Sequence, residues 1–204
     1  MAGGEMALDL SKFQWFCQPA RFELVDNTLT IYTDPVTDYW QRTYYGFRHN
    51  NAHAFVTPIA KNEFSFTVKT SWKPEKLFDQ CGVVLYQDED NWFKASVEFD
   101  NEKFSRLGSV VTNLGYSDWS TSDVDSTLQT MWYRLSRRGQ DFMIENSGDG
   151  QEFKQMRIFH MHEPIQAANI GVYACSPLTS SIKSVFTDFT IGPCQWKPYV
   201  NPEE

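Results

Sequence analysis

Segments in which apolar and polar residues alternate with a period of two recur along almost the whole chain. This period puts successive side chains on opposite faces of a β-sheet, whereas an amphipathic helix repeats every 3.6 residues. No long segment shows the helical period. Turn-forming residues separate the alternating segments, for example at residues 26–27 and 147–150. The sequence therefore predicts an all-β protein with almost no α-helix.

The number of alternating segments also constrains the architecture. There are at least about ten, which is more than one open sheet accommodates comfortably. Two antiparallel sheets packed as a sandwich would bury the apolar faces of both. The 204 residues contain no linker, repeat or low-complexity tract. We therefore expect a single domain over residues 1–204, with a core from about 13 to 193 and a flexible tail at 197–204.

Composition argues against several kinds of partner. The formal charge is −8, and the only clustered cations are Arg137 and Arg138 at a predicted turn, so we expect no nucleic-acid partner. No apolar run reaches the roughly 18 to 20 residues of a membrane span, so we expect no membrane partner. The first residues do not resemble a signal peptide, and the four cysteines show no paired spacing. We therefore expect reduced thiols and a cytoplasmic protein.

One predicted strand, residues 91–100 (NWFKASVEFD), carries different chemistry on its two faces. The odd positions are apolar: Phe93, Ala95, Val97 and Phe99. The even positions combine an aromatic ring, an ammonium, a hydroxyl and a carboxylate: Trp92, Lys94, Ser96 and Glu98. We expect the first set in the core and the second on an outer face of the sheet.

Six segments in a fixed order give the chain a resemblance to a known family. They are DQCGVVLYQDEDNWFKASVEFD, VVTNLGYSDWS, WYRLSRRG, ENSGDG, IGVYACSP and FTDFTIG. Together they resemble the regulation-of-enolase-like family, a domain family of unsettled biochemical function, and residues 37–55 resemble its N-terminal part. The resemblance covers residues 13–193. It implies a concanavalin A-like jelly-roll sandwich of two curved antiparallel sheets, as in the lectin and glucanase superfamily, where ligands bind the concave outer face.

The implied concave sheet would bring the outward residues of several strands to one groove. Parity selects Asp38, Trp40, Trp92, Lys94, Glu98, Arg134 and Tyr173, with His53 nearby in sequence. Trp119 is either an aromatic residue at the groove edge or a loop anchor packed on the sandwich. We expect the groove to centre on Glu98 and Arg134. The alternative is that Lys94, Glu98 and Arg134 form a solvated ladder of ion pairs that binds nothing.

This residue set predicts a non-catalytic module for a carbohydrate-like or anionic small ligand. Aromatic faces stack on sugar rings, and charged groups form directional hydrogen bonds with hydroxyls. An arginine could equally bind a carboxylate or phosphate. Two alternatives stay open. One is a glycan-active enzyme, a hydrolase or lyase, that uses Glu98. The other is a regulatory protein-interaction module, with a metabolic enzyme as the partner that the family name suggests.

Further motifs concern catalysis and metal binding. Residues 98–102 have the Glu-x-Asp-x-Glu spacing of a glucanase motif, but Asp100 to Lys103 have turn chemistry, which would direct Glu102 away from Glu98. The histidine pairs at 49 and 53 and at 160 and 162, and the acidic segment 117–126, which we interpret as a polar loop, do not complete a metal-ligand pattern. We therefore expect no catalytic pair at 98 and 102, and neither a metal nor a cofactor.

Overall fold

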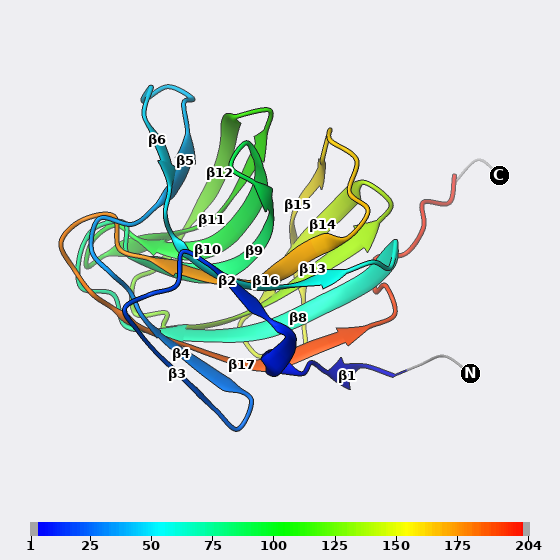
Figure 1. Ribbon diagram of the computed structural model, residues 1–204, viewed down its shortest axis with the longest axis horizontal. Helices are drawn as coiled ribbons and strands as arrows, with labels where there is room; N and C mark the ends of the chain where they lie inside the picture. The colour runs from blue at the N-terminus through cyan, green and yellow to red at the C-terminus, as the bar shows by residue number, and fades with distance from the viewer. Residues whose placement is uncertain (1–3, 202–204) are drawn as a thin grey trace.

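A computed structural model describes residues 4–201, which form two large antiparallel sheets packed face to face (Figure 1). The described residues contain one short 3-10 helix, η1 (Leu10–Lys12), and no α-helix. None of their helices is long and apolar enough to cross a membrane. The prediction of an all-β jelly-roll sandwich is confirmed.

The first sheet, sheet I, has eight strands. Its order is β15 (Lys154–His160), β14 (Asp141–Ser147), β13 (Thr130–Arg138), β8 (Glu63–Trp72), β17 (Lys183–Gly192), β4 (Thr28–Tyr32) and β3 (Arg21–Val25). The short β1 (Met6–Ala7) pairs with β17 at one end. Three neighbouring pairs in this order, β13–β8, β8–β17 and β17–β4, join strands that are far apart in the sequence. Long-range pairing therefore holds this sheet together.

The second sheet, sheet II, has seven strands. Its order is β12 (Tyr116–Asp125), β11 (Phe104–Asn113), β10 (Asn91–Phe99), β9 (Gln80–Asp88), β16 (Ala168–Cys175), β7 (His53–Ile59) and β2 (Gln14–Phe16). A separate hairpin of β5 (Tyr39–Gln41) and β6 (Arg48–Asn50) stands at the upper left of Figure 1, beside β12 and β11. This hairpin contacts β12 and partly covers the outer face of sheet II.

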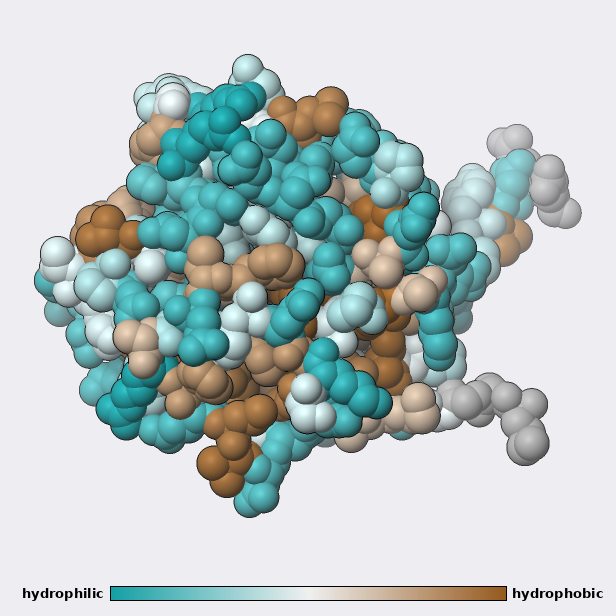
Figure 2. All heavy atoms as spheres, in the orientation of Figure 1, coloured by the Kyte–Doolittle hydropathy of each residue, from teal (hydrophilic) through white to brown (hydrophobic). Residues whose placement is uncertain are grey.

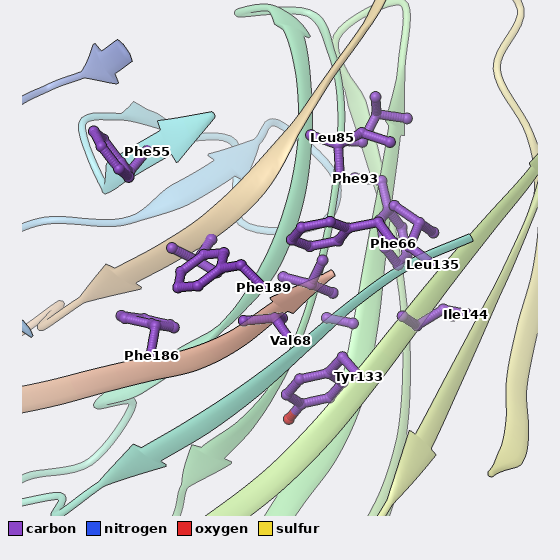
Figure 3. Packing of buried hydrophobic residues seen from close by; sticks show 14 of the residues in the cluster. Phe55, Phe66, Val68, Leu85, Phe93, Tyr133, Leu135, Ile144, Phe186 and Phe189 are labelled. Carbon is purple, nitrogen blue, oxygen red and sulfur yellow. The ribbon is translucent and has the colours of Figure 1, made fainter. Parts of the chain in front are cut away.

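The main core fills the space between the sheets. Figure 3 shows aromatic and aliphatic side chains from both sheets meeting there, among them Phe66, Phe93, Tyr133 and Phe189. All four are fully buried, and burial of each such side chain stabilises the fold by about 1.5 to 3 kcal/mol. The predicted inward set of β10 is confirmed for Phe93, Ala95 and Val97, while Phe99 at the strand end is only partly buried.

A second apolar cluster lies on the outer face of sheet II. Its buried members are Tyr39, Trp40, Ala52, Ala54, Val56, Val84, Tyr86, Trp92, Val110, Tyr173 and Cys175. Tyr39 and Trp40 come from the β5–β6 hairpin, and most of the others come from sheet II. The hairpin therefore gives sheet II a partial third layer and leaves only part of its concave face open.

Two local predictions meet different outcomes. The predicted turn after β10 is confirmed, because β10 ends at Phe99, β11 begins at Phe104, and Asn101 Oδ1 accepts hydrogen bonds from the amides of Lys103 and Phe104. The predicted loop at 117–126 is wrong, because these residues form most of the edge strand β12. Most of their side chains face solvent on both sides of the sheet, so no apolar alternation marks the strand.

The structure describes the two ends of the chain only in part. Residues 197–201 have no regular secondary structure. Residues 202–204 of the predicted flexible tail, and residues 1–3, lie outside the described residues.

Candidate ligand-binding groove

A hollow of about 300 Å³ lies on the outer face of sheet II, beside the β5–β6 hairpin. We call it the groove. Its lining residues are Val36, Asp38, Tyr45, Phe47, His49, Phe78, Gln80, Lys94, Glu98, Trp119, Pro177 and Leu178. Strands β9, β10 and β12 supply the residues of the sheet, the hairpin supplies Tyr45, Phe47 and His49, and loops supply the rest. A volume of this size is at the lower end of the range for small-molecule sites.

The first charged group of the groove is an ion pair. Lys94 Nζ lies 3.3 Å from Asp38 Oδ1, and the Lys94 side chain is only 6% exposed. Burial by itself would lower the pKa of the Lys94 ammonium, but the charge of Asp38, with those of Cys175 and Glu98, outweighs burial and raises this pKa. Lys94 therefore stays charged, and its charge is already compensated within the protein.

The second charged group, Glu98, ends a chain of hydrogen bonds. Gln80 Nε2 donates to Glu98 Oε2 at 2.7 Å, and the Tyr173 hydroxyl donates to Gln80 Oε1 at 2.7 Å. The Tyr173 hydroxyl also lies 2.8 Å from Ser96 Oγ. These bonds satisfy the buried phenol and orient the amide of Gln80, so that Glu98 is held in one position at the groove floor.

Strand register explains how this chain of hydrogen bonds forms. Gly82 on β9 lies between Ser96 on β10 and Tyr173 on β16. Without a side chain on Gly82, the Tyr173 ring can cross β9 and reach Ser96. A Cβ at Gly82 would also collide with the backbone carbonyl of Ala95. Glycine is therefore required here by the close approach of two backbones as well as by the crossing ring.

Burial changes the acidity of Glu98. It raises the pKa of this carboxyl to about 7, against the opposing influence of the Lys94 ammonium; the charge of Asp38 raises it further. Hydrogen bonding from Gln80 and the charge of Arg106 act in the opposite direction. Glu98 therefore exchanges a proton near neutral pH, and it is the group in the groove best suited to acid–base chemistry.

The walls of the groove are mainly aromatic. The rings of Tyr45 and Phe47 stack at 5.4 Å with an interplanar angle of 15°, and Phe47 contacts the His49 ring at 4.7 Å. Trp119 rises from β12 beside Gly108, where an added Cβ would lie 3.2 Å from the indole nitrogen. The missing side chain at Gly108 thus leaves room for the Trp119 ring. Exposed rings grouped in this way are unusual on a plain surface and indicate a binding site.

The structure brings together some predicted site residues but not others. Asp38, Lys94, Glu98 and Trp119 line the groove. Trp40 packs behind the rim, edge-on to Trp119 at 6.3 Å. The two alternatives for Trp119 are resolved in favour of the groove edge.

Trp92 and Tyr173, expected as groove walls, are fully buried instead. Tyr39 of the hairpin packs over both rings, at centroid distances of 5.5 and 6.3 Å. They support the floor from below and cannot touch a ligand.

The prediction that Arg134 lies in the groove is wrong. Parity correctly places Arg134 on an outer face, but β13 pairs with β8 and β14 in sheet I, on the other side of the sandwich. There its guanidinium forms two hydrogen bonds with Glu145, of 2.6 and 2.8 Å, and lies over the Phe153 ring. The predicted ladder of Lys94, Glu98 and Arg134 is excluded for the same reason.

The prediction that His53 lies at the groove is also wrong. His53 is 2% exposed, and its Nδ1 lies 2.6 Å from the Cys17 carbonyl oxygen. Its Nε2 accepts a hydrogen bond from the Asp34 amide, so Nδ1 carries the proton. Burial lowers the pKa of this imidazole. His53 is therefore a neutral structural residue that joins two loops to β7.

Some of the groove residues that the sequence analysis missed had a signal in the sequence, and the others had none. Gln80 follows the same parity as Glu98, its partner across the β9–β10 pair, so register could have indicated it. The aromatic run at residues 44–47 was a visible signal at a turn. Val36, Phe78, Pro177 and Leu178 come from loops, and no local pattern placed them.

The described residues offer no obvious metal site. In residues 4–201, no three histidine, cysteine, aspartate or glutamate side chains are grouped closely enough to hold a metal ion. His160 Nδ1 lies 2.6 Å from Asp141 Oδ1, at hydrogen-bond distance, and the His160 ring lies beside the ring of His162. Asp141 is therefore the side-chain partner of His160.

The fold and the groove define a concanavalin A-like jelly-roll sandwich with a ligand-sized hollow on its concave sheet. The chain belongs to the family described as "Protein of unknown function (DUF1349)", which matches residues 15–194. It is 28% identical over 186 residues, or 90% of each chain, to Regulation of enolase protein 1 of Saccharomyces cerevisiae. The resemblance found in the sequence is confirmed.

Solved structures resemble this chain in fold. The chain resembles a functionally unknown protein from Saccharomyces cerevisiae, with a TM-score of 0.86, 26% identity, and coverage of 93% of this chain and 100% of that one. A GH43 protein from Bacillus licheniformis has a TM-score of 0.71 and 14% identity, over 92% of this chain but only 38% of that one. The VIP36 lumenal domain, in a form bound to Ca²⁺ and Man3GlcNAc, has a TM-score of 0.56 and 9% identity, over 96% and 88%. The last two likenesses concern the fold alone.

Proposed function

We propose that the groove binds a polyhydroxylated, carbohydrate-like ligand without a strong net charge. The observation that carries this proposal is the combination of aromatic walls with a floor whose one ammonium group is already paired with a carboxylate inside the protein. Tyr45, Phe47 and Trp119 offer ring faces for the apolar side of a sugar. The Glu98 carboxyl group on the floor, oriented by Gln80, offers directional hydrogen bonds for hydroxyl groups.

The charges of the floor favour a neutral ligand over an anion. Lys94 is the one lysine or arginine in the groove lining, and Asp38 already neutralises it. Glu98 adds a negative charge whenever it is ionised. An incoming carboxylate or phosphate would therefore meet a floor of zero or negative net charge. The arginine that would have favoured an anion lies on the other sheet, so the carbohydrate-like branch of the prediction is the better supported one.

Glu98 supports a second candidate function, a glycan-active enzyme. Its pKa of about 7 suits a general acid, and Asp38 provides a second carboxylate in the same groove. Under this alternative, Glu98→Gln would abolish turnover of chromogenic glycosides but leave carbohydrate binding in place. Binding without turnover of any glycoside by the unmodified protein favours the non-catalytic role.

The regulatory alternative draws support from the name of the yeast relative, which concerns enolase. A protein-interaction module would be expected to present a broad apolar patch. Figure 2 shows hydrophilic residues over much of the face in view, with hydrophobic residues gathered toward its lower middle. We place the small-ligand function first because the groove is the more specific feature.

The test is a thermal-shift screen against neutral sugars, sugar acids and phosphosugars, followed by titration calorimetry of the hits. A ligand of the native state raises the melting temperature by mass action. Trp119→Ala should weaken binding by about 1 kcal/mol, or roughly fivefold, through the loss of one stacking surface. Trp132→Ala is the matched control, since Trp132 lies on sheet I against Lys69. The proposal fails if no neutral carbohydrate binds or if both variants weaken binding equally.

A further inference from the structure

A second hollow, of about 420 Å³, adjoins the groove on the far side of the hairpin tip. Its lining residues are Trp40, Thr43, Tyr44, Tyr45, Ser117, Asp118 and Trp119. Tyr45 and Trp119 line both hollows. The two spaces are therefore neighbours that share an aromatic boundary.

The shared boundary is built as one ring cluster. The ring of Trp40 lies edge-on to Tyr45 at 5.4 Å and edge-on to Trp119 at 6.3 Å. Its indole nitrogen donates a hydrogen bond to the Thr43 carbonyl oxygen at 3.1 Å. Trp40 thus fixes both boundary rings and the turn at the same time. Each boundary ring remains accessible, with Tyr45 exposed by 53% and Trp119 by 39%.

The hairpin tip holds a further ring outward at a conformational cost. Arg42 and Tyr44 have positive φ angles of 56° and 61°, in the left-handed region that non-glycine residues rarely adopt. The Tyr44 side chain is 95% exposed and touches the edge of Tyr45. Folding by itself gains little from an aromatic ring in water on a strained turn. A ligand that covers the ring would explain its position.

Strand β12 forms the other wall of the second hollow. Ser117 Oγ accepts a hydrogen bond from the Gln41 backbone amide, which fixes this strand against the hairpin. Ser117 and Trp119 lie on the outer face of β12, whereas the Asp118 side chain points to the other face, where it forms an ion pair with Arg157 of β15. The second hollow is therefore bounded mainly by aromatic rings, as the groove is.

We propose that the groove and the second hollow form one extended site for an oligosaccharide, with one unit in the groove and the adjacent unit in the second hollow beside Tyr44. This inference rests on the proposed function of the groove and adds the size of the ligand to it. Tyr45 and Trp119 would contact both units at the linkage between them. A ligand of two or more units gains a second stacking surface that a monosaccharide cannot reach.

Titration calorimetry with saccharides of increasing length tests this proposal. The probes are glucose, xylose and mannose, each with its β-1,4-linked dimer and trimer. For the sugar that binds, we expect the dimer to bind at least tenfold more tightly than the monomer. Tyr44→Ala should remove most of this gain and leave monomer affinity unchanged, because Tyr44 lines only the second hollow. Tyr199→Ala is the matched control, since Tyr199 is also exposed, by 85%, and lines neither hollow.

The outcomes separate this inference from the proposed function. Equal affinity for monomer and dimer would overturn the extended site and leave the groove as a monosaccharide site. A dimer preference that survives Tyr44→Ala would also overturn it, because the gain would then come from another surface. Failure of every saccharide in the series to bind would count against both proposals.

Discussion

Lys94 Nζ on β10 lies 3.3 Å from Asp38 Oδ1, in the segment that leads into β5. This contact joins the floor of sheet II to the hairpin that covers it. Asp38 Oδ1 also accepts a hydrogen bond from the Tyr39 amide at 2.7 Å. The ion pair therefore fixes the direction in which the chain enters the hairpin, and with it the aromatic wall of the groove.

The ion pair predicts a strong coupling between its two residues. Lys94→Met leaves the Asp38 carboxylate without its cation and should destabilise the fold by about 2 to 4 kcal/mol. The double variant Lys94→Met/Asp38→Asn should recover a large part of this loss, because no unpaired charge remains. Urea unfolding of the wild type and of the two single and one double variants measures the coupling. Additive effects of the two substitutions would contradict an interaction between them.

Glu98 predicts a specific pH dependence. Its folded-state pKa of about 7 lies above the ordinary value of 4.5. Between these values the unfolded chain releases the proton while the folded protein keeps it, so this residue makes stability fall as pH rises from about 4.5 to 7. Glu98→Gln should remove the effect, and its stability relative to wild type should rise by on the order of 1 to 3 kcal/mol from pH 5 to pH 8. A pH-independent difference between the two proteins would show that Glu98 titrates normally.

Gly82 predicts a strict requirement for glycine. Gly82→Ala places a methyl group in collision with the Ala95 carbonyl oxygen and 3.0 Å from the Ser96 Cα atom. We expect a loss of about 3 kcal/mol or more in unfolding free energy, as for severe overpacking. Gly148→Ala is the control, since no atom lies within 4 Å of its added methyl. Similar melting temperatures for both variants would argue against the close packing of β9 with β10.

The cysteines predict two classes of thiol. Burial raises the pKa of Cys81 to about 12 and raises that of Cys175 well above its usual range. Cys17 is exposed and Cys194 is half-buried. At about pH 8, a thiol reagent should therefore modify Cys17 and Cys194 in the native protein, and all four cysteines only after unfolding. Fewer than four thiols in the denatured, unreduced protein would contradict both the predicted absence of disulfides and the predicted cytoplasmic location.

The local alternation on β10 predicted which of its side chains enter the core, and it predicted that Lys94 and Glu98 lie on the face that carries the groove. Period-two parity directed Phe93 inward and Lys94 outward, and both directions are confirmed. Parity is a local property of a strand, which is why it can be derived from a short segment. It also predicted correctly that Arg134 faces outward.

The pairing of strands could not be derived in the same way. Arg134 belongs to sheet I because β13 pairs with β8, which lies about sixty residues earlier in the chain, and no local pattern records such a pairing. The burial of Trp92 and Tyr173 depends on Tyr39, which the hairpin brings over them from a distant segment. Long-range contacts of this kind decide which outward residues remain available to a ligand.

The most direct test of the groove is a ¹H–¹⁵N spectrum of the tryptophan indoles during titration with unlabelled saccharides. The chain has seven tryptophans, and Trp119 on β12 and Trp132 on β13 lie on opposite sides of the sandwich. If the groove binds a carbohydrate-like ligand, the Trp119 indole signal should shift in a saturable way while that of Trp132 stays fixed. An unchanged Trp119 signal with every saccharide, or a larger shift at Trp132, would contradict the groove as the binding site.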